Sequence, residues 1–268
     1  MFKKLIDISK NLRVKILETA MKNGGKGSHI GGTFSCIEIL VFLYFGRILK
    51  FKSEKPKWKG RDRLLIGKGH AHLALYHIWH DLGFIGKKLL ESYGKNGSKL
   101  GQQLNINTPG SEYNTGSLGH VLGIGTGISY SAKLDGKKFT TYVLLGDAEC
   151  DEGAIWEAAM FAGKYKLNNL VAIIDKNNLS VMERIKESKD LNLSSRFKSC
   201  GWETLKVDGH SFQNLKKTFK KISYKKPTVI IAETIKGKGI SFMENEIFWH
   251  SGIATKEQFN KAISEIKG

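Results

Sequence analysis

The stretch LLGDAECDEGAIWEAAMFAGKYKLNNLVAIIDKNNL (Leu144–Leu179) decides the fold of this chain. An apolar run ends in Asp147, a helical pattern covers Glu152–Lys166, and a second apolar run, Asn169–Asp175, is followed by Asn177. A strand, a helix and a strand in this order are typical of two parallel strands joined by a crossover helix. The carboxyl ends of parallel strands meet at one edge of a sheet, where such sheets bind ligands. We therefore expect Asp147 and Asn177 to lie close together.

The residue types at these two strand ends indicate a phosphate and a divalent metal. Gly146 permits a tight turn, and a helix that begins near Glu152 directs its partly positive N-terminus toward the same edge. The Asp147 carboxylate and the Asn177 carboxamide oxygen are hard ligands suited to Mg²⁺ or Ca²⁺. Because one carboxylate is few for such a metal, phosphate oxygens and water would complete its coordination. The alternative is a capping aspartate and a turn asparagine that bind no ligand.

The rest of the chain repeats the alternation of strands and helices. Strands are predicted at Asp62–Lys68, Thr140–Asp147, Asn169–Asp175, Trp202–Asp208 and Pro227–Ile235. Helices are predicted at His72–Leu82, Glu152–Lys166 and Phe212–Ile222, with an amphipathic helix at the N-terminus. The third and fifth strands are continuous Val- and Ile-rich runs, as expected of strands covered on both faces. This predicts one doubly wound, mostly parallel α/β sheet with helices on both faces, formed by residues 1–268 as a single domain.

Composition excludes several classes of protein. The hydrophobic content of 41% and the charged content of 25% are ordinary for a globular domain. No run of eighteen apolar residues is present, and the N-terminus lacks the apolar centre of a signal peptide, so no membrane association is expected. Three widely spaced cysteines, Cys36, Cys150 and Cys200, argue against a disulfide framework and favour a cytoplasmic protein.

The net charge of +18 raises the question of nucleic acid. Only six of the 43 basic residues are arginines, although base recognition depends strongly on arginine. The lysines are dispersed, and the densest group, Leu215–Lys226, has the helical spacing of a solvated face. We therefore expect no nucleic-acid partner.

Six ordered blocks of sequence resemble the transketolase family. Leu144–Leu179 resembles the thiamine-diphosphate motif of that family, GDG followed by N after about thirty residues, in its transketolase form. The other blocks are Gly27–Gly32 (GSHIGG), Gly67–Gly83 (GKGHAHLALYHIWHDLG), Asn114–His120 (NTGSLGH), Gly201–His210 (GWETLKVDGH) and Thr234–His250 (TIKGKGISFMENEIFWH). Any single block would be a weak signal, but six in order cover nearly the whole chain.

The resemblance implies roles for particular residues. The metal ligands would be Asp147, Asn177 and the main-chain oxygen of Leu179. Contacts to thiamine diphosphate would come from His70, Gly116, Ser117, Leu118, Gly146, Asp147, Ala148, Glu149, Asn177, Lys236 and His250. The catalytic histidines would be His29, His70 and His250, because imidazole can transfer protons near neutral pH. Glu152 matches a glutamate at the dimer interface, whereas His72, His77 and His80 match no motif.

The resemblance also implies a second polypeptide. A full transketolase is more than twice as long as this chain and carries a pyrimidine-binding domain with the glutamate that activates the cofactor. This chain resembles the N-terminal subunit of a split transketolase, so we expect a C-terminal partner in an α2β2 assembly and no activity from the chain alone. The expected substrates are sugar phosphates or activated sugars.

Several positions depart from the family pattern. Ala148 replaces the second glycine of GDG, and Val121 stands where a glycine is usual. Gln103, or Gln102 with a shifted gap, replaces a sugar-contacting histidine, and Ser180–Arg184 (SVMER) lacks the usual DG. These changes suggest an unusual ketose or acceptor. Two alternatives stay open: another thiamine-diphosphate enzyme, such as deoxyxylulose-phosphate synthase or a 2-oxo acid dehydrogenase subunit, and a non-catalytic basic scaffold.

Overall fold

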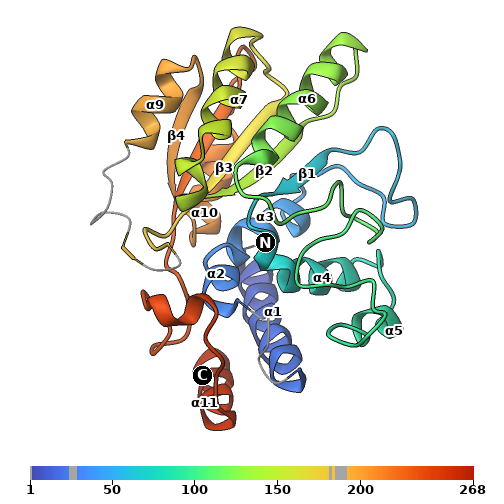
Figure 1. Cartoon of the computed structure of the whole chain (residues 1–268), viewed down its shortest axis with the longest axis vertical. Helices are drawn as coiled ribbons and strands as arrows, with labels where there is room; N and C mark the ends of the chain where they lie inside the picture. Colours follow the sequence, from blue (N-terminus) through green and yellow to red (C-terminus); the bar gives the residue numbers. More distant parts are fainter. Residues whose placement is uncertain (1, 24–28, 181–182, 185–191) are drawn as a thin grey trace.

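A five-stranded parallel sheet forms the centre of the molecule (Figure 1). The computed structural model describes residues 2–23, 29–180, 183–184 and 192–268. The strand order is β1-β2-β3-β5-β4, and every neighbouring pair is parallel. The strands are β1 (Arg63–Ile66), β2 (Thr141–Gly146), β3 (Leu170–Lys176), β4 (Glu203–Asp208) and β5 (Thr228–Glu233). All five predicted strands are therefore present.

Alternate residues of the central strands supply two separate cores. Leu144, Ile173 and Ile230 belong to one apolar cluster, whereas their neighbours Val143 and Val229 belong to the other. The first cluster is shared with α1 (Phe2–Lys22), α3 (Ile37–Phe45), α4 (His72–Asp81), α10 (Phe212–Phe219) and α11 (Lys256–Lys267). The second is shared with α6 (His120–Leu134), α7 (Gly153–Lys164) and α9 (Leu193–Ser199). Because side chains alternate across a strand, these helices cover both faces, and the doubly wound fold is confirmed.

The element boundaries differ slightly from those predicted. The helix predicted over Phe212–Ile222 ends at Phe219, because the chain must turn to enter β5 at Thr228. Strand β4 is an edge strand and is only partly buried, whereas β3 and β5 are buried along nearly their whole length, as predicted. The other short helices in the described part of the chain are α2 (Ile30–Ser35), α5 (Lys87–Leu90), η1 (Gly69–Ala71), η2 (Ala148–Asp151) and η3 (Ile247–His250).

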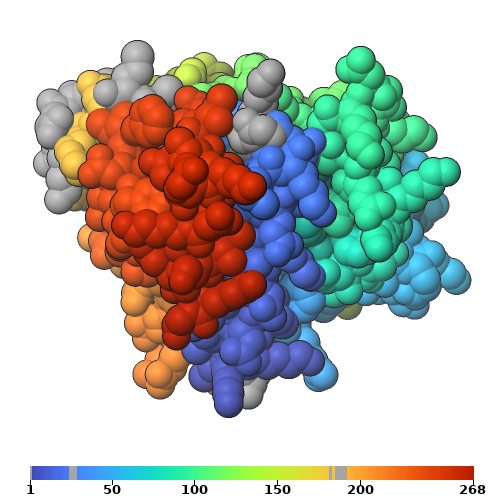
Figure 2. Space-filling model, turned by 90° about the horizontal axis from the view of Figure 1, so that it is seen from below, coloured from blue at the N-terminus to red at the C-terminus, as the bar shows by residue number. Residues whose placement is uncertain are grey.

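The two ends of the chain lie side by side. Figure 2 shows the C-terminal part, coloured red, directly against the N-terminal part, coloured blue, and α1 packs against α11. The segment after β5 is joined to the start of α2 through a hydrogen bond from the Gly237 amide to the Gly31 carbonyl, 2.9 Å long. Residues from both ends of the sequence thereby reach the carboxyl edge of the sheet. Within the described residues, no helix is long and apolar enough to cross a membrane.

Candidate active site

The ends of β2 and β3 bring Asp147 and Asn177 together, as their spacing predicts. Gly146 and Asp175 are register partners, so the residues that follow them are neighbours. One Asp147 oxygen accepts a hydrogen bond from the Asn178 amide at 2.6 Å, and the other accepts from the Ala148 amide at 2.9 Å. Asp147 therefore does cap η2, but it also joins two strand ends that are far apart in sequence.

A buried ion pair lies behind this carboxylate. Lys68, from the loop after β1, donates to Asp175, to the Gly32 carbonyl at 2.8 Å and to the Ser35 hydroxyl at 3.1 Å. Its three ammonium protons are therefore all used within the protein. Sequence reasoning did not single out Lys68, although it lies inside the quoted block GKGHA. Asp175, which is fully buried, also accepts from Ser35 and Thr234.

Among the described residues, Asp147 forms no such ion pair of its own, although the Lys68 charge lies nearby. Burial, together with the nearby Asp175 charge, raises the pKa of Asp147 to about 6. The Asn178 amide, the Lys68 charge and the Ala148 amide only partly offset this rise. A buried carboxylate in this state is stabilised by a cation placed beside it. The donor set therefore fits a divalent metal better than it fits an isolated capping residue. No group of three or more His, Cys, Asp or Glu side chains forms a ready metal site among the described residues, so other ligands would have to contribute.

Glu149 joins the end of β2 to the start of α6. Its two carboxylate oxygens accept from the Gly119 and Gly146 amides, each at 3.1 Å. Burial raises the pKa of Glu149 to about 7. A methyl group on Gly67 would come within 2.1 Å of this carboxylate, so the close approach requires glycine there.

Three histidines from three separate segments meet beside the strand ends. The ring centroids of His29 and His70 are 5.5 Å apart, those of His29 and His250 are 5.6 Å apart, and those of His70 and His250 are 5.2 Å apart. A methyl group on Gly32 would lie 2.8 Å from the His70 ring, so glycine is needed for this approach. The predicted catalytic histidines are thus brought together.

Lys236 connects the histidines to the loop after β3. Its ammonium group donates to the Ser180 carbonyl at 2.9 Å and lies 3.1 Å from Nδ1 of His250. Burial lowers the pKa of Lys236 to about 8 and that of His250 to about 4. Burial, with the Lys68 charge next in weight, also holds the pKa of His70 well below its ordinary range. Neutral His70 and His250 can each donate one hydrogen bond and accept another at neutral pH.

Most of these groups line a cavity of about 70 Å³; His29 lies beside His70 and His250 but not in the lining. Its lining includes the predicted residues His70, Leu118, Gly146, Asp147, Ala148, Glu149, Asn177, Leu179, Lys236 and His250, and also Gly32, Lys68 and Ser180. Gly116 and Ser117 are exposed and do not line it. The Ala148 amide is already bonded to Asp147, so its contact with a diphosphate stays a prediction. Gly27, Ser28, Val181 and Met182, which belong to two of the quoted motifs, lie outside the described residues.

The histidines that match no family motif lie away from the cavity lining, and two of them are buried in the core. His72 is buried, and its Nε2 lies 2.9 Å from the Tyr93 hydroxyl. His77 is also buried, with its Nε2 2.9 Å from the Thr19 hydroxyl, whereas His80 is partly exposed. The first two are therefore core residues, one of the two roles open to them from the sequence.

Two of the departures from the family pattern have a structural explanation. Val121 is fully buried in the core between the sheet and α6, where its side chain fills apolar space. The Gln103 carboxamide oxygen accepts from the Thr115 hydroxyl at 2.9 Å, and a methyl group on Gly69 would come within 2.0 Å of that oxygen. Because Gly69 lies between Lys68 and His70, Gln103 packs on the backbone at the edge of the cavity.

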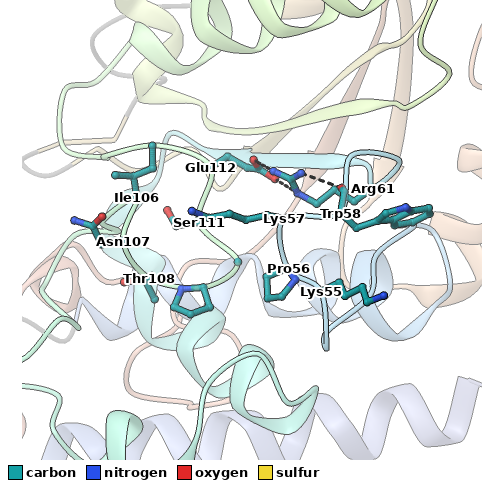
Figure 3. A pocket seen from close by; sticks show the side chains of 12 residues that line it. Lys55, Pro56, Lys57, Trp58, Arg61, Ile106, Asn107, Thr108, Ser111 and Glu112 are labelled. Carbon is teal, nitrogen blue, oxygen red and sulfur yellow. Dashed lines mark hydrogen bonds and ion pairs between the residues drawn. The ribbon is translucent and has the colours of Figure 1, made fainter.

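A larger cavity of about 910 Å³ lies elsewhere, between the loops Lys55–Arg61 and Ile106–Glu112 (Figure 3). Arg61 forms a two-pronged ion pair with Glu112, with N–O distances of 3.0 and 2.6 Å. Figure 3 shows Lys57 extending from one loop toward Ser111 of the other. The Lys55 and Lys57 side chains are exposed, and Thr108 and Ser111 donate to backbone carbonyls.

The fold and the small cavity define a cofactor-binding α/β protein whose polar residues gather at the carboxyl ends of parallel strands. The family model described as "Transketolase, thiamine diphosphate binding domain" matches residues 3–265. The chain therefore belongs to the transketolase family.

Two relatives of similar length are named as single transketolase subunits. The chain is 41% identical to one subunit of the apulose-4-phosphate transketolase of Phocaeicola vulgatus, over 96% of this chain and 92% of the relative. It is 35% identical to a 6-deoxy-6-sulfo-D-fructose transketolase subunit of a Clostridium species, over 89% of this chain and 88% of the relative. The human transketolase is also 35% identical, but the match covers only 42% of that protein. The predicted correspondence to the N-terminal subunit of a split transketolase, and the transferase class, are confirmed.

The fold is also that of a solved transketolase. The structure of the Campylobacter jejuni enzyme superposes with a TM-score of 0.91 at 28% identity, covering 98% of this chain and 43% of that one. The thiamine-diphosphate-binding type of domain predicted from the motif is therefore confirmed.

Proposed function

We propose that this chain, as one diphosphate-binding domain, holds the diphosphate and metal end of thiamine diphosphate and transfers a two-carbon ketol unit between sugar or sugar-phosphate substrates together with a C-terminal partner. The observation that carries the proposal is the buried Asp147 carboxylate beside Asn177, facing a cavity that Lys236 and two histidines also line. The names of the relatives in divided transketolases support the substrate class.

The residues present fit the metal and the cofactor. Asp147, Asn177 and the main-chain oxygen of Leu179 would hold Mg²⁺, or Ca²⁺ in its place, and the metal would supply the positive charge that the buried carboxylate lacks. Lys236 and the turn at Gly146–Ala148 would face the diphosphate. Leu118, which is 49% exposed at the rim, would lie toward the rings with Gly116 and Ser117. Thiamine diphosphate supplies the carbanion-stabilising chemistry that breaks and forms carbon–carbon bonds.

The protein's own part in the reaction is positioning and proton transfer. His29, His70 and His250 lie within one cluster, so a sugar hydroxyl held among them would have a hydrogen-bond partner on more than one side. Neutral imidazoles at His70 and His250 can accept a proton from such a hydroxyl and return it. Lys236, 3.1 Å from His250, would keep that imidazole oriented.

An exposed apolar face supports the proposal that this chain binds a second polypeptide. A groove of about 520 Å³ runs between α6 and α7, lined by Gly123, Ile124, Gly127, Ala158 and Phe161 among others. Phe161 is 39% exposed and Met160 beside it is 56% exposed. Contiguous exposed apolar residues mark protein interfaces more often than free surface. We assign this face and the exposed Glu152 at the start of α7 to an α2β2 assembly with the partner.

The test is turnover of a panel of ketose phosphates by the purified chain, by a candidate C-terminal transketolase subunit, and by their equimolar mixture. We expect activity only in the mixture, because the relatives that this chain matches over nearly their whole length are named as single transketolase subunits. Robust turnover by this chain alone would contradict the split-subunit proposal.

The scaffold alternative has a separate test. Calorimetric titration with thiamine diphosphate and Mg²⁺, with and without the partner, should give binding in the assembled enzyme, and a scaffold would give none. The cytoplasmic location expected from the cysteines stays a prediction; all three are free thiols in the structure.

A further inference from the structure

A buried hydrogen-bonded network outside the cavity holds the backbone on both sides of Lys236. It consists of Arg13 from α1, Glu38 from α3 and His210 from the loop after β4. The Arg13 guanidinium forms a fork with the Glu38 carboxylate, with N–O distances of 2.7 and 3.0 Å. Nδ1 of His210 lies 2.8 Å from the second Glu38 oxygen. Arg13 and Glu38 are both almost completely buried, although such side chains rarely are unless paired.

The network contacts the segment after β5 at two points. The Ile235 amide donates to Nε2 of His210 at 2.8 Å, directly before Lys236. Nε of Arg13 donates to the Lys238 carbonyl at 2.9 Å, two residues after Lys236. The Glu38 carboxylate is the common partner of both holding groups, so the two contacts are linked through one side chain.

The hydrogen bonds determine the state of His210. Because a backbone amide can only donate, Nε2 must be unprotonated, and Nδ1 therefore carries the proton and donates to Glu38. This requires a group with one donor and one acceptor in a fixed orientation. Gly209 brings the loop close enough: a methyl group there would lie 2.5 Å from Thr234 and 3.1 Å from the Glu233 carbonyl.

We propose that His210, Arg13 and Glu38 act as positioning residues that place the Lys236 ammonium group in the diphosphate cavity. Lys236 is 1% exposed, and its side chain reaches Ser180 and His250 only from the backbone position that the network holds. A small shift of that backbone would move the ammonium group away from both. The positioning of Lys236 stands on these contacts alone, whereas its consequence for diphosphate binding rests on the proposed function.

The test compares His210→Ala, His210→Gln and the control His77→Ala in the full chain. His77 is a buried histidine of the α4 core whose hydrogen bond goes to Thr19, outside this network, so its removal reports loss of core packing. The first readout is the rate of reductive methylation of Lys236 by mass spectrometry, without cofactor. The second is the affinity for inorganic diphosphate with Mg²⁺ in the assembled enzyme, and the third is the Tm.

We expect His210→Ala to raise the Lys236 methylation rate measurably and to weaken diphosphate binding about tenfold, a loss in the range seen when residues that orient a metal ligand are removed. His210→Gln should stay near wild type, because a carboxamide offers the same donor and acceptor. His77→Ala should lower the Tm without either change. Unchanged methylation in His210→Ala, or the same increase in His77→Ala, would overturn the proposal.

Two further outcomes remain decisive. If His210→Ala does not fold, Arg13→Lys takes its place, because an ammonium group cannot form the fork with Glu38 and also reach the Lys238 carbonyl in the same geometry. Faster methylation of Lys236 in Arg13→Lys supports the network, and unchanged methylation contradicts it. If methylation changes but the wild-type enzyme binds no diphosphate, the positioning role stands and the proposed function fails.

Discussion

Two of the cavities differ in opposite senses: the larger one has few buried polar groups, and the smaller one has many. The cavity between the loops of Lys55–Arg61 and Ile106–Glu112 has a volume of about 910 Å³, and its cations are exposed or already paired. The cavity at the ends of β2 and β3 has about 70 Å³, yet buried charged groups and histidines from four distant segments line it. Volume alone would select the wrong one.

The two cavities differ in how much support their charged groups need from the rest of the fold. An exposed lysine keeps its hydration and needs no support from the protein, whereas a buried carboxylate such as Asp147 is unfavourable unless something compensates it. The small cavity holds such groups in place through backbone amides and the Lys68–Asp175 pair. Buried charged groups that the protein holds in place are therefore a stronger indication of function than a large cavity volume.

The largest expected effect is on the metal. Asp147→Ala should weaken Mg²⁺-dependent binding of thiamine diphosphate at least about 100-fold, roughly 3 kcal/mol, because it removes the carboxylate that we propose as a metal ligand. Asn177→Ala should weaken it less, since it removes a neutral ligand. Titration calorimetry of the assembled enzyme measures both, with removal of Mg²⁺ by a chelator as the reference. If Asp147→Ala bound the cofactor with wild-type affinity, the small cavity would no longer be favoured over the large one as the cofactor site.

The second effect is on turnover, and it should distinguish His70 from His72, two residues further along the chain. His70→Ala should lower turnover by about 100-fold or more even with the partner present, as expected for loss of a group that transfers protons. His250→Ala should behave in the same way. The control His72→Ala should lower the Tm but leave the turnover of the folded enzyme nearly unchanged, because His72 packs against Tyr93 in the core. Equal loss of turnover in all three variants would argue against this division.

A third effect concerns pH. Burial lowers the pKa of Lys236 from 10.5 to about 8, so the ammonium group is charged below pH 8 and loses its charge above it. A bound diphosphate favours the charged form, and affinity should therefore fall above pH 8, by at most about tenfold per pH unit for one proton. Lys236→Met should bind about tenfold more weakly at pH 7 and lose this pH dependence. An unchanged profile in Lys236→Met would mean that another group is responsible.

Substitutions in the larger cavity should not affect cofactor binding. Lys57→Met and Arg61→Met should leave the affinity for thiamine diphosphate within about twofold of wild type. Arg61→Met should lower the free energy of unfolding by about 1 kcal/mol, because it breaks a partly buried ion pair with Glu112. Denaturant titration and calorimetry measure the two quantities. A large loss of cofactor affinity in either variant would make the loop cavity part of the site.

The smallest effect is on nucleic acid. If the net charge of +18 is generic, duplex DNA should bind weakly, and the binding should disappear steeply as salt is raised. Lys57→Met should change it only slightly, since that lysine is one of many exposed ones. Sequence-selective binding that persists at physiological salt would revive the scaffold alternative.

The residues at the strand ends were easier to predict from the sequence than the buried Lys68–Asp175 pair behind them. Asp147 and Asn177 were predictable because each follows a recognisable buried strand, and parallel strands place such residues at one edge. Lys68 was not singled out, because nothing in its neighbourhood shows that its partner is Asp175, more than a hundred residues away. The exposure of Gly116 and Ser117, outside the cavity lining, was equally unreadable from their motif.

By itself, the sequence determined the alternation of strands and helices, the burial of β3 and β5 and the family motif, because these depend on residue type and local periodicity. Only the tertiary structure decided that three histidines from separate segments share one cluster, that His72 and His77 belong to the core, and that Arg13, Glu38 and His210 hold Lys236. The physical reason is that these contacts join residues distant in the chain. Such distances follow from how helices pack on the sheet, which no short stretch of sequence specifies.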